Sequence, residues 1–324
     1  MSDIVPKQSG ERCSPLRNET TPSINPTQIN LRKTMKELTT KTNKPIAIAL
    51  GYFDCVHFAH RRIIACAVET AREKGIASAV LTFSNELSSK GSPPVYAFKE
   101  RKRLISQLGA DYVIPFHFDE QFKIQSAAKF LEKLFNTYDI RFIACGSDYR
   151  FGHMGEGNAE FLKGFAAGKS VEVRVFEPIT MGGEVVSTSL IKKELTAGNI
   201  KKVNRLLCSP YFFEGKVTKG KGRGQGMGYP TANLRPCDRL LPKFGVYKSR
   251  TILDGEIFNS LTSVGDKPTF DDHSVTVETF VDGDVFNLYN KTIHVELIDF
   301  LRPLNKFASV SKLKAQIKKD LEKL

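Results

Sequence analysis

Two histidines three residues apart, His57 and His60, are the first side chains of this sequence that could do chemistry. They lie in GYFDCVHFAH (51–60), at the end of the apolar run PIAIALGYF (45–53), which predicts a buried parallel strand. Gly51 is therefore expected where a strand leads into a helix, the usual place of nucleotide binding in α/β domains. Histidines there can donate to phosphate oxygens beside the helix amides. The plainer alternative is a pair of polar residues that cap the helix.

Metal binding by sequence motif is not expected. The HxxH spacing lacks both the i, i+4 pair and the glutamate of an HExxH zinc site. The six cysteines, at positions 13, 55, 66, 145, 208 and 237, form no CxxC pair. We expect reduced thiols in a cytoplasmic protein.

A second candidate site is the glycine-rich stretch GKGRGQGMGYPTANL (220–234), which includes Gly222, Gly224 and Gly228. Alternating glycines let backbone amides close on phosphates, and the Thr231 hydroxyl and Asn233 amide offer the oxygen ligands that Mg²⁺ prefers. The overlapping segment GKVTKGK (215–221) matches the first part of a P-loop motif. It is not a P-loop, because Gly222 follows where serine or threonine is required. A linker or a tight hairpin is an equally good interpretation of the glycines alone.

Two further stretches carry charged groups. GSDYRFGHMGEGN (146–158) follows another buried strand and brings Asp148 and Arg150 to a glycine-rich loop, which suits either a ligand crevice or a plain loop. In SVTVETFV (274–281), strand alternation puts Val277 and Thr279 on one face and Glu278 on the other. A single glutamate on a strand usually faces solvent, so spacing alone assigns Glu278 no role.

These candidates need two kinds of scaffold. Strands alternate with helices up to about residue 207, which predicts a doubly wound, Rossmann-like α/β domain. Short alternating segments separated by Asp-Gly and Gly-Asp turns follow, which predicts a small antiparallel β-barrel with one C-terminal helix. We predict a disordered extension over 1–28, the α/β domain over 29–207 and the barrel over 208–324.

Composition limits the partners. There is no apolar run near 18 residues and no signal-peptide pattern, so no membrane partner is expected. The net charge of +13 favours anionic ligands. The densest basic cluster of the sequence is SKLKAQIKKDLEKL, which has the spacing of an amphipathic helix with a solvated basic face. Small phosphate-bearing molecules are therefore favoured over nucleic acid as partners.

Together these segments resemble the prokaryotic bifunctional riboflavin kinase/FMN adenylyltransferase (FAD synthetase) family. The resemblance runs from about residue 30 to the C-terminus, and its most specific part is the sequence of segments LLCSPYFFEGKV, GRGQGMGYPTANL, LPKFGVY, SVGDKPTF, TVETF and LRPLNKF. It implies a barrel that transfers the ATP γ-phosphate to riboflavin. On this basis Thr231 and Asn233 hold Mg²⁺ and phosphates, Glu278 is the general base, and the glycine loop covers the nucleotide.

The amino half resembles the nucleotidyltransferase domain of that family, which joins AMP from ATP to FMN. The motif G-x-F-D-G-V-H-x-G-H is represented by GYFDCVHFAH, and the flavin and nucleotide loop by GSDYRFG. The resemblance implies that the nucleotide is bound by Gly51, Phe53, Asp54, His57, His60, Asp148, Arg150, Ser187 and Thr188. The expected ligands are ATP, riboflavin, FMN and Mg²⁺.

The amino half also departs from the family pattern. Cys55 and Ala59 replace two motif glycines, Ser84–Leu87 lack a histidine and two prolines, and Leu190 stands where a cation meets phosphate. A lost cation of this kind costs several kcal/mol of transition-state stabilisation, so adenylyl transfer is expected to be the weaker activity. Two alternatives remain open: a riboflavin kinase with a non-catalytic amino domain, and a flavin-binding regulatory or nucleic-acid-interacting protein.

Overall fold

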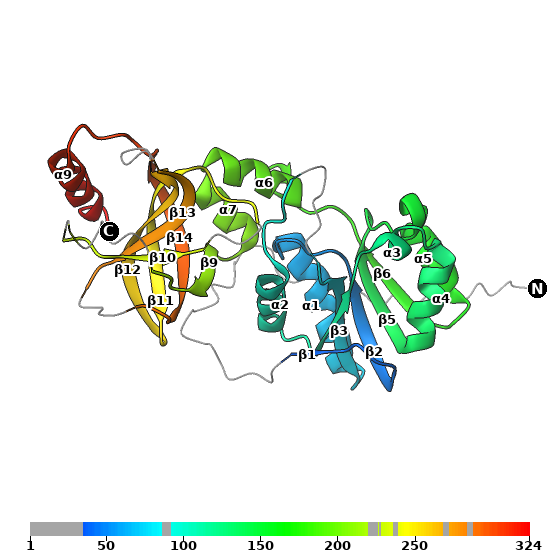
Figure 1. Cartoon of the computed structure of the whole chain (residues 1–324). Coiled ribbons are helices and arrows are strands. Elements are labelled where there is room, and N and C mark those ends of the chain that lie inside the picture. Colours follow the sequence, from blue (N-terminus) through cyan, green and yellow to red (C-terminus); the bar gives the residue numbers. More distant parts are fainter. Residues whose placement is uncertain are drawn as a thin grey trace, which may run out of the picture.

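The computed structural model describes residues 35–85, 92–219, 226, 228–235, 239–267, 272–283 and 288–324. Figure 1 shows an α/β unit built on one sheet and a curved antiparallel unit built on another, with helices α6 and α7 between them. Among the described residues, no helix is long and apolar enough to cross a membrane. The predicted extension over 1–28 lies outside the described residues.

The first unit is a six-stranded parallel sheet in the order β1-β4-β3-β2-β5-β6. Its strands are β1 (Lys36–Glu37), β2 (Thr42–Leu50), β3 (Ala77–Phe83), β4 (Tyr112–Phe116), β5 (Tyr138–Gly146) and β6 (Glu172–Phe176). Its helices are α1 (Phe58–Glu73), α2 (Phe98–Gln107), α3 (Glu120–Lys123), α4 (Ala127–Thr137), the 3₁₀ turn η1 (His153–Gly155) and α5 (Ala159–Ala167). The doubly wound prediction is confirmed.

Helices cover both faces of this sheet, and β2 shows why. Its residues 46–50 are almost completely buried, since Ala47 and Ala49 point into the core beneath α1 and α2 while Ile48 and Leu50 point into the core beneath α4 and α5. A strand that is covered on both faces must carry apolar side chains on both, and this explains the continuous apolar run at residues 46–50. Helix α1 ends two residues before Gly75, whose positive φ of 65° suits the residue that follows a helix.

A short hairpin and two helices lead into the second unit. The hairpin pairs β7 (Thr180–Met181) with β8 (Glu184–Val185), and the helices are α6 (Thr188–Ala197) and α7 (Ile200–Leu207). Asn204 on α7 joins the helix to the barrel, because its amide donates to the Leu297 carbonyl at 2.8 Å and its oxygen accepts from the Tyr211 amide at 2.8 Å.

The second unit is a six-stranded antiparallel sheet in the order β10-β13-β12-β11-β14-β9. Thr218, just after β9, bridges to Asn233 on β10, so the two outer strands meet and the sheet curves into a barrel. The strands are β9 (Tyr211–Lys216), β10 (Thr231–Leu234), β11 (Gly245–Leu253), β12 (Glu256–Lys267), β13 (Asp272–Val281) and β14 (Thr292–Arg302), and the C-terminal helix is α9 (Val310–Leu321). The predicted barrel with a terminal helix is confirmed.

Hydroxyl groups fill part of the barrel interior. Ser249 bonds to both Ser260 and Thr262 at 2.8 Å, and Thr262 bonds to Thr279 at 2.9 Å. All four side chains are fully buried. Because each of these four hydroxyls has a partner, this polar ladder is compatible with a packed core.

The two units share one continuous core. Tyr96, from the α/β unit, stacks on Tyr211 and Phe212 of the barrel at centroid distances of 5.5 and 4.9 Å. Arg239 from the barrel reaches Glu100 on α2 in a buried ion pair. The predicted boundary at residue 207/208 stays a prediction, since packing crosses it without a gap.

Candidate functional site

The crevice of the α/β unit lies where the strand order reverses. From β2 the chain moves outward through β3 and β4, and then returns to place β5 on the other side of β2. Strands β2 and β5 run parallel, so their carboxyl ends, at Leu50–Gly51 and Gly146, lie at the same edge of the sheet. Nucleotide sites in such folds lie at this edge. A cavity of about 750 Å³ opens there.

The structure brings most of the predicted amino-half residues to this cavity. Its lining includes Gly51, Phe53, Asp54, His60, Asp148, Arg150 and Thr188. Ser187 is the N-cap of α6 instead, and its hydroxyl accepts from the Leu190 amide at 3.2 Å. Its oxygen is therefore engaged in ending the helix beside the cavity.

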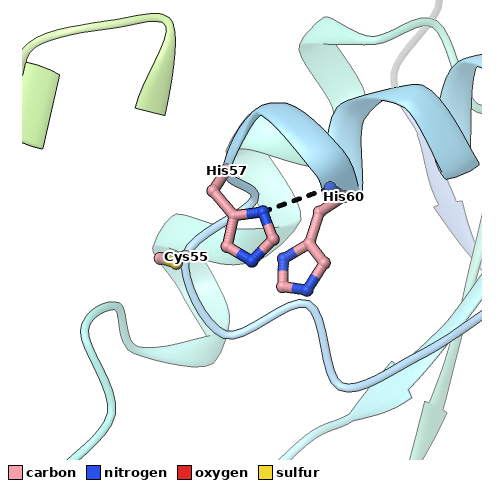
Figure 2. Close-up of side chains that lie close together, drawn as sticks. All are labelled: Cys55, His57 and His60. Carbon is pink, nitrogen blue, oxygen red and sulfur yellow. Dashed lines mark hydrogen bonds between the residues drawn. The ribbon is translucent and has the colours of Figure 1, made fainter. Parts of the chain in front are cut away.

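The two histidines lie face to face at the start of α1, as Figure 2 shows. Their rings stack with centroids 3.5 Å apart, and His57 caps the helix by accepting the His60 amide at its Nδ1, at 3.3 Å. Burial lowers the pKa of His57 to about 4 and lowers that of His60 well below its usual range. Both imidazoles are therefore neutral at pH 7, so each offers one N–H donor and no positive charge.

Hydrogen bonds and an ion pair fix the loop between β2 and α1. Asp54 accepts the Val95 amide at 2.7 Å and lies 3.6 Å from Lys192 on α6, and burial raises its pKa. Arg61 donates from its Nε to the Val56 carbonyl at 3.1 Å. Phe53 and Val56 adopt positive φ values of 51° and 47°, which are unfavourable for side chains of this size and persist only where the surroundings impose them. These contacts therefore hold the loop in its conformation beside the cavity.

Arg101 on α2 was not predicted, and it joins the ends of two strands at the cavity. The side chain is fully buried, and its guanidinium donates to the Tyr52 carbonyl at 3.2 Å, the Thr82 hydroxyl at 2.8 Å and the Phe83 carbonyl at 2.9 Å. No motif marks it, since FKERKRLISQ has the pattern of an ordinary amphipathic surface helix.

An aromatic wall on one side of the cavity was also missed. Phe122 packs edge-on against Phe83 and Phe130, at 5.6 and 5.8 Å, and Phe118 packs against Phe83 at 5.2 Å. All four rings line the cavity. The density of aromatics in PFHFDEQF (115–122) was the available signal, and such a wall suits a flat aromatic ligand.

The barrel brings together the residues predicted for its own site. In the pairing of β10 with β13, Asn233 lies opposite Glu278 and Thr231 opposite Phe280. Ala232 and Leu234 are buried, so Thr231, Asn233 and Glu278 share the outer, half-exposed face. The predicted alternation along SVTVETFV is confirmed, because Val277 and Thr279 are fully buried and Glu278 is not.

Part of the predicted glycine loop can be placed. Gly222 and Gly224 lie outside the described residues. Gly228 has a positive φ of 83°, as a tight turn into Tyr229-Pro230 requires, and the Tyr229 ring packs edge-on against Phe280 at 5.7 Å. The turn therefore delivers the chain to the same outer face as Glu278.

The departures from the family pattern occupy definite places. Cys55 is buried, with its sulfur 3.7 Å from the Thr188 hydroxyl. Leu190 packs against the shared core and adds no charge to the site. Asn85 exchanges two hydrogen bonds with the backbone of Phe118, at 2.9 and 2.8 Å, and so ties its loop to the aromatic wall. Glu86 and Leu87 lie outside the described residues.

Comparison with known proteins agrees with this architecture. The family model described as FAD synthetase matches residues 39–190, and the one described as riboflavin kinase matches residues 207–324. The bifunctional riboflavin kinase/FMN adenylyltransferase of Listeria monocytogenes is 32% identical over 281 residues, which cover 84% of this chain and 89% of that protein. The protein of the same description from Bacillus subtilis is 31% identical and covers the same shares.

A solved structure shares the whole fold. The crystal structure of a protein from Streptococcus pneumoniae, named there as a macrolide-efflux protein, superimposes with a TM-score of 0.77 at 28% sequence identity, covering 90% of this chain and 98% of that one. The fold and the two family matches define an enzyme that joins an FAD synthetase-type α/β domain to a riboflavin kinase-type barrel. The chain belongs to the bifunctional riboflavin kinase/FMN adenylyltransferase family.

Proposed function

We propose that this chain phosphorylates riboflavin with ATP to give FMN on the barrel, and adenylylates FMN with a second ATP in the α/β crevice to give FAD. The observation that carries the proposal is the register of β10 against β13, which sets Asn233 opposite Glu278 on the face where Thr231 also lies. The family relationship supplies the substrates, and the arrangement of the residues supports the chemistry.

Phosphoryl transfer needs mainly positioning, charge neutralisation and an acceptor for one proton. The Thr231 hydroxyl and the Asn233 amide oxygen are hard ligands that fit Mg²⁺ together with ATP phosphates, and the metal would neutralise the charge of those phosphates. Both residues lie on β10, whose pairing with β13 sets the backbone from which their side chains project.

Glu278 is suited to accept the proton. As the ribityl hydroxyl of riboflavin attacks the γ-phosphorus, its proton passes to the Glu278 carboxylate, the bond to the β-phosphate oxygen breaks and ADP leaves. A general base of this kind contributes about 10²–10⁴-fold to the rate.

The α/β crevice is suited to adenylyl transfer from ATP to FMN. The start of α1 offers amides and the neutral imidazole of His60, on which the buried His57 ring stacks, to the triphosphate. The aromatic wall offers a flat apolar surface to the isoalloxazine ring. The FMN phosphate attacks the α-phosphorus of ATP and pyrophosphate leaves.

Two observations favour a second candidate, a riboflavin kinase whose amino domain has lost most of its activity. Leu190 places an apolar side chain where the family carries a cation, and Lys192, two residues further along α6, already lies 3.6 Å from the Asp54 carboxylate. A phosphate entering the crevice therefore meets less positive charge than in the family pattern.

A time course with purified protein, riboflavin, ATP and Mg²⁺, with the flavins separated by chromatography, tests both candidates. FMN followed by FAD supports the bifunctional enzyme, and FMN that accumulates without FAD supports the kinase alone. Formation of neither product would refute both and leave a flavin-binding regulatory protein.

The variant Glu278→Gln tests the base. It is expected to lower kcat for FMN formation by about 10²–10⁴-fold while riboflavin binding, followed by flavin fluorescence, is unchanged. Glu256→Gln is the matched control, since Glu256 is an exposed strand glutamate of the same barrel. An unchanged rate in Glu278→Gln would refute the assignment.

A further inference from the structure

Cys55, His57 and His60 bring one thiol and two imidazoles together at the start of α1, with the two rings side by side and Cys55 next to them (Figure 2). One potential ligand atom from each residue lies within 4.8 Å of the other two. Within the part of the chain that the structure describes, no other three histidine, cysteine or acidic side chains gather in this way.

The absence of an HExxH motif excludes only a zinc site built on one helix face. The three residues of this cluster do not share a helix face. Cys55 comes from the loop after β2, His57 is the N-cap residue with extended backbone, and His60 lies in the first turn of α1. The tight loop turns all three side chains to the same side. Cys55 stands where the family motif has glycine, so the third ligand is a feature of this chain.

The surroundings leave these groups short of partners. The Nδ1 atom of His60 is buried and has no hydrogen-bond partner. The Cys55 sulfur has the long 3.7 Å contact to the Thr188 hydroxyl and a hydrogen bond with the His57 backbone. Cys55 and His57 are 1% and 4% exposed. A buried unpaired ring nitrogen is costly, and a metal ion would satisfy it.

We propose that Cys55, His57 and His60 form a binding site for Zn²⁺ or a similar transition metal, with the fourth position open to water. One thiolate and two imidazoles are ligands that zinc prefers, and three protein ligands with an open position is a common zinc arrangement. The thiol proton leaves to solvent on binding.

Binding requires small adjustments. Neighbouring ligand atoms of a tetrahedral zinc ion lie about 3.3–3.6 Å apart. The ligand atoms here lie within 4.8 Å of one another, so side-chain rotation must close the separations by at most about 1.5 Å. Ligation by His57 also gives up its 3.3 Å cap bond with the His60 amide, whichever ring nitrogen binds the metal. That bond is long and weak beside three metal–ligand bonds.

The site has a consequence that rests on the proposed function. A metal there occupies His60, which lines the α/β crevice, together with the His57 ring stacked on it, so it competes with nucleotide in that crevice. We expect Zn²⁺ to inhibit FAD formation and to leave FMN formation on the barrel unchanged.

Binding is tested first without any activity measurement. The full-length, metal-free protein is titrated with Co²⁺, which replaces zinc and gives a thiolate-to-cobalt charge-transfer band in the near ultraviolet. We expect saturation at one equivalent, and we expect Cys55→Ser to abolish the band and weaken Co²⁺ binding at least about 100-fold. Cys208→Ser is the matched control, because Cys208 is another free thiol and is more accessible.

A saturating band that survives in Cys55→Ser, or no band in the unaltered protein, would overturn the proposal. His60→Gln provides a second test should Cys55→Ser fail to fold, and it too must weaken Co²⁺ binding. In the activity arm, Cys55→Gly at buffered free Zn²⁺ should need at least about 100-fold more Zn²⁺ for the same loss of FAD formation. Absence of FAD in every variant would count against the proposed function, while the cobalt titration would still decide the metal site.

Discussion

Replacing Arg239 with methionine should destabilise both units of the protein, because this side chain crosses the boundary between them. Its guanidinium pairs with Glu100 on α2 and donates to the Phe212 carbonyl at 2.8 Å. It also lies over the rings of Tyr96 and Tyr211, each at 4.8 Å. Arg239 and Glu100 are both about 95% buried.

The magnitude follows from leaving Glu100 without its partner. Removing one member of a buried ion pair costs about 3–5 kcal/mol, because the other charge stays in a medium that solvates it poorly. For a chain of this length, 1 kcal/mol corresponds to about 2 °C, so Tm should fall by about 6–10 °C. Methionine keeps much of the apolar packing of the arginine stem, which confines the loss to the charge and its hydrogen bonds.

Thermal and urea unfolding measure this loss. Arg141→Met is the matched control, since Arg141 pairs with Asp139 at the surface and should cost less than about 1 kcal/mol. Glu100→Gln keeps a side-chain oxygen that can accept the Ala97 amide, and the double variant should cost about 2 kcal/mol less than the sum of the single variants. A loss below about 1 kcal/mol in Arg239→Met, or strict additivity, would refute a coupled buried pair.

Two further predictions concern charge. Leu190→Arg should raise the rate of FAD formation about tenfold or more, because it restores a cation near the triphosphate. FMN formation on the barrel is the internal control. An unchanged rate of FAD formation would show that the missing cation does not limit adenylyl transfer. Burial lowers the pKa of His294 below its usual 6.5, so the unfolded state takes up the proton at higher pH than the folded state does. The free energy of unfolding should therefore be highest above about pH 6.5 and fall below it, and His294→Asn should flatten that slope in urea titrations. An equal slope in the variant would contradict the assignment.

The order of the elements could be predicted because it depends on local patterns. The run IAIAL in β2 is apolar at every position, which only a strand covered on both faces requires, and the alternation in VTVETFV has the period of a half-exposed strand. The short edge strands β1 and β6 were not predicted. An edge strand has a neighbour on one side only, so its sequence carries a weaker signal.

The barrel site could be predicted only as a set of residues. Sequence proximity puts Thr231 and Asn233 on one strand, but Glu278 lies 45 positions further along the chain. The register of β10 against β13 puts Glu278 opposite Asn233, and a shift by one residue would turn it to the other face. Pairing between strands decides such a contact.

The sequence by itself determined the family, the two scaffolds and the residue types at each site, because these depend on composition, period and motif. Only the tertiary structure decided which groups share a space. It placed Arg101 beneath the crevice, carried Arg239 across to Glu100 and turned Cys55 toward two histidines. The reason is physical: burial and the charge of neighbours set what each group can do, and both depend on side chains that are distant in the chain.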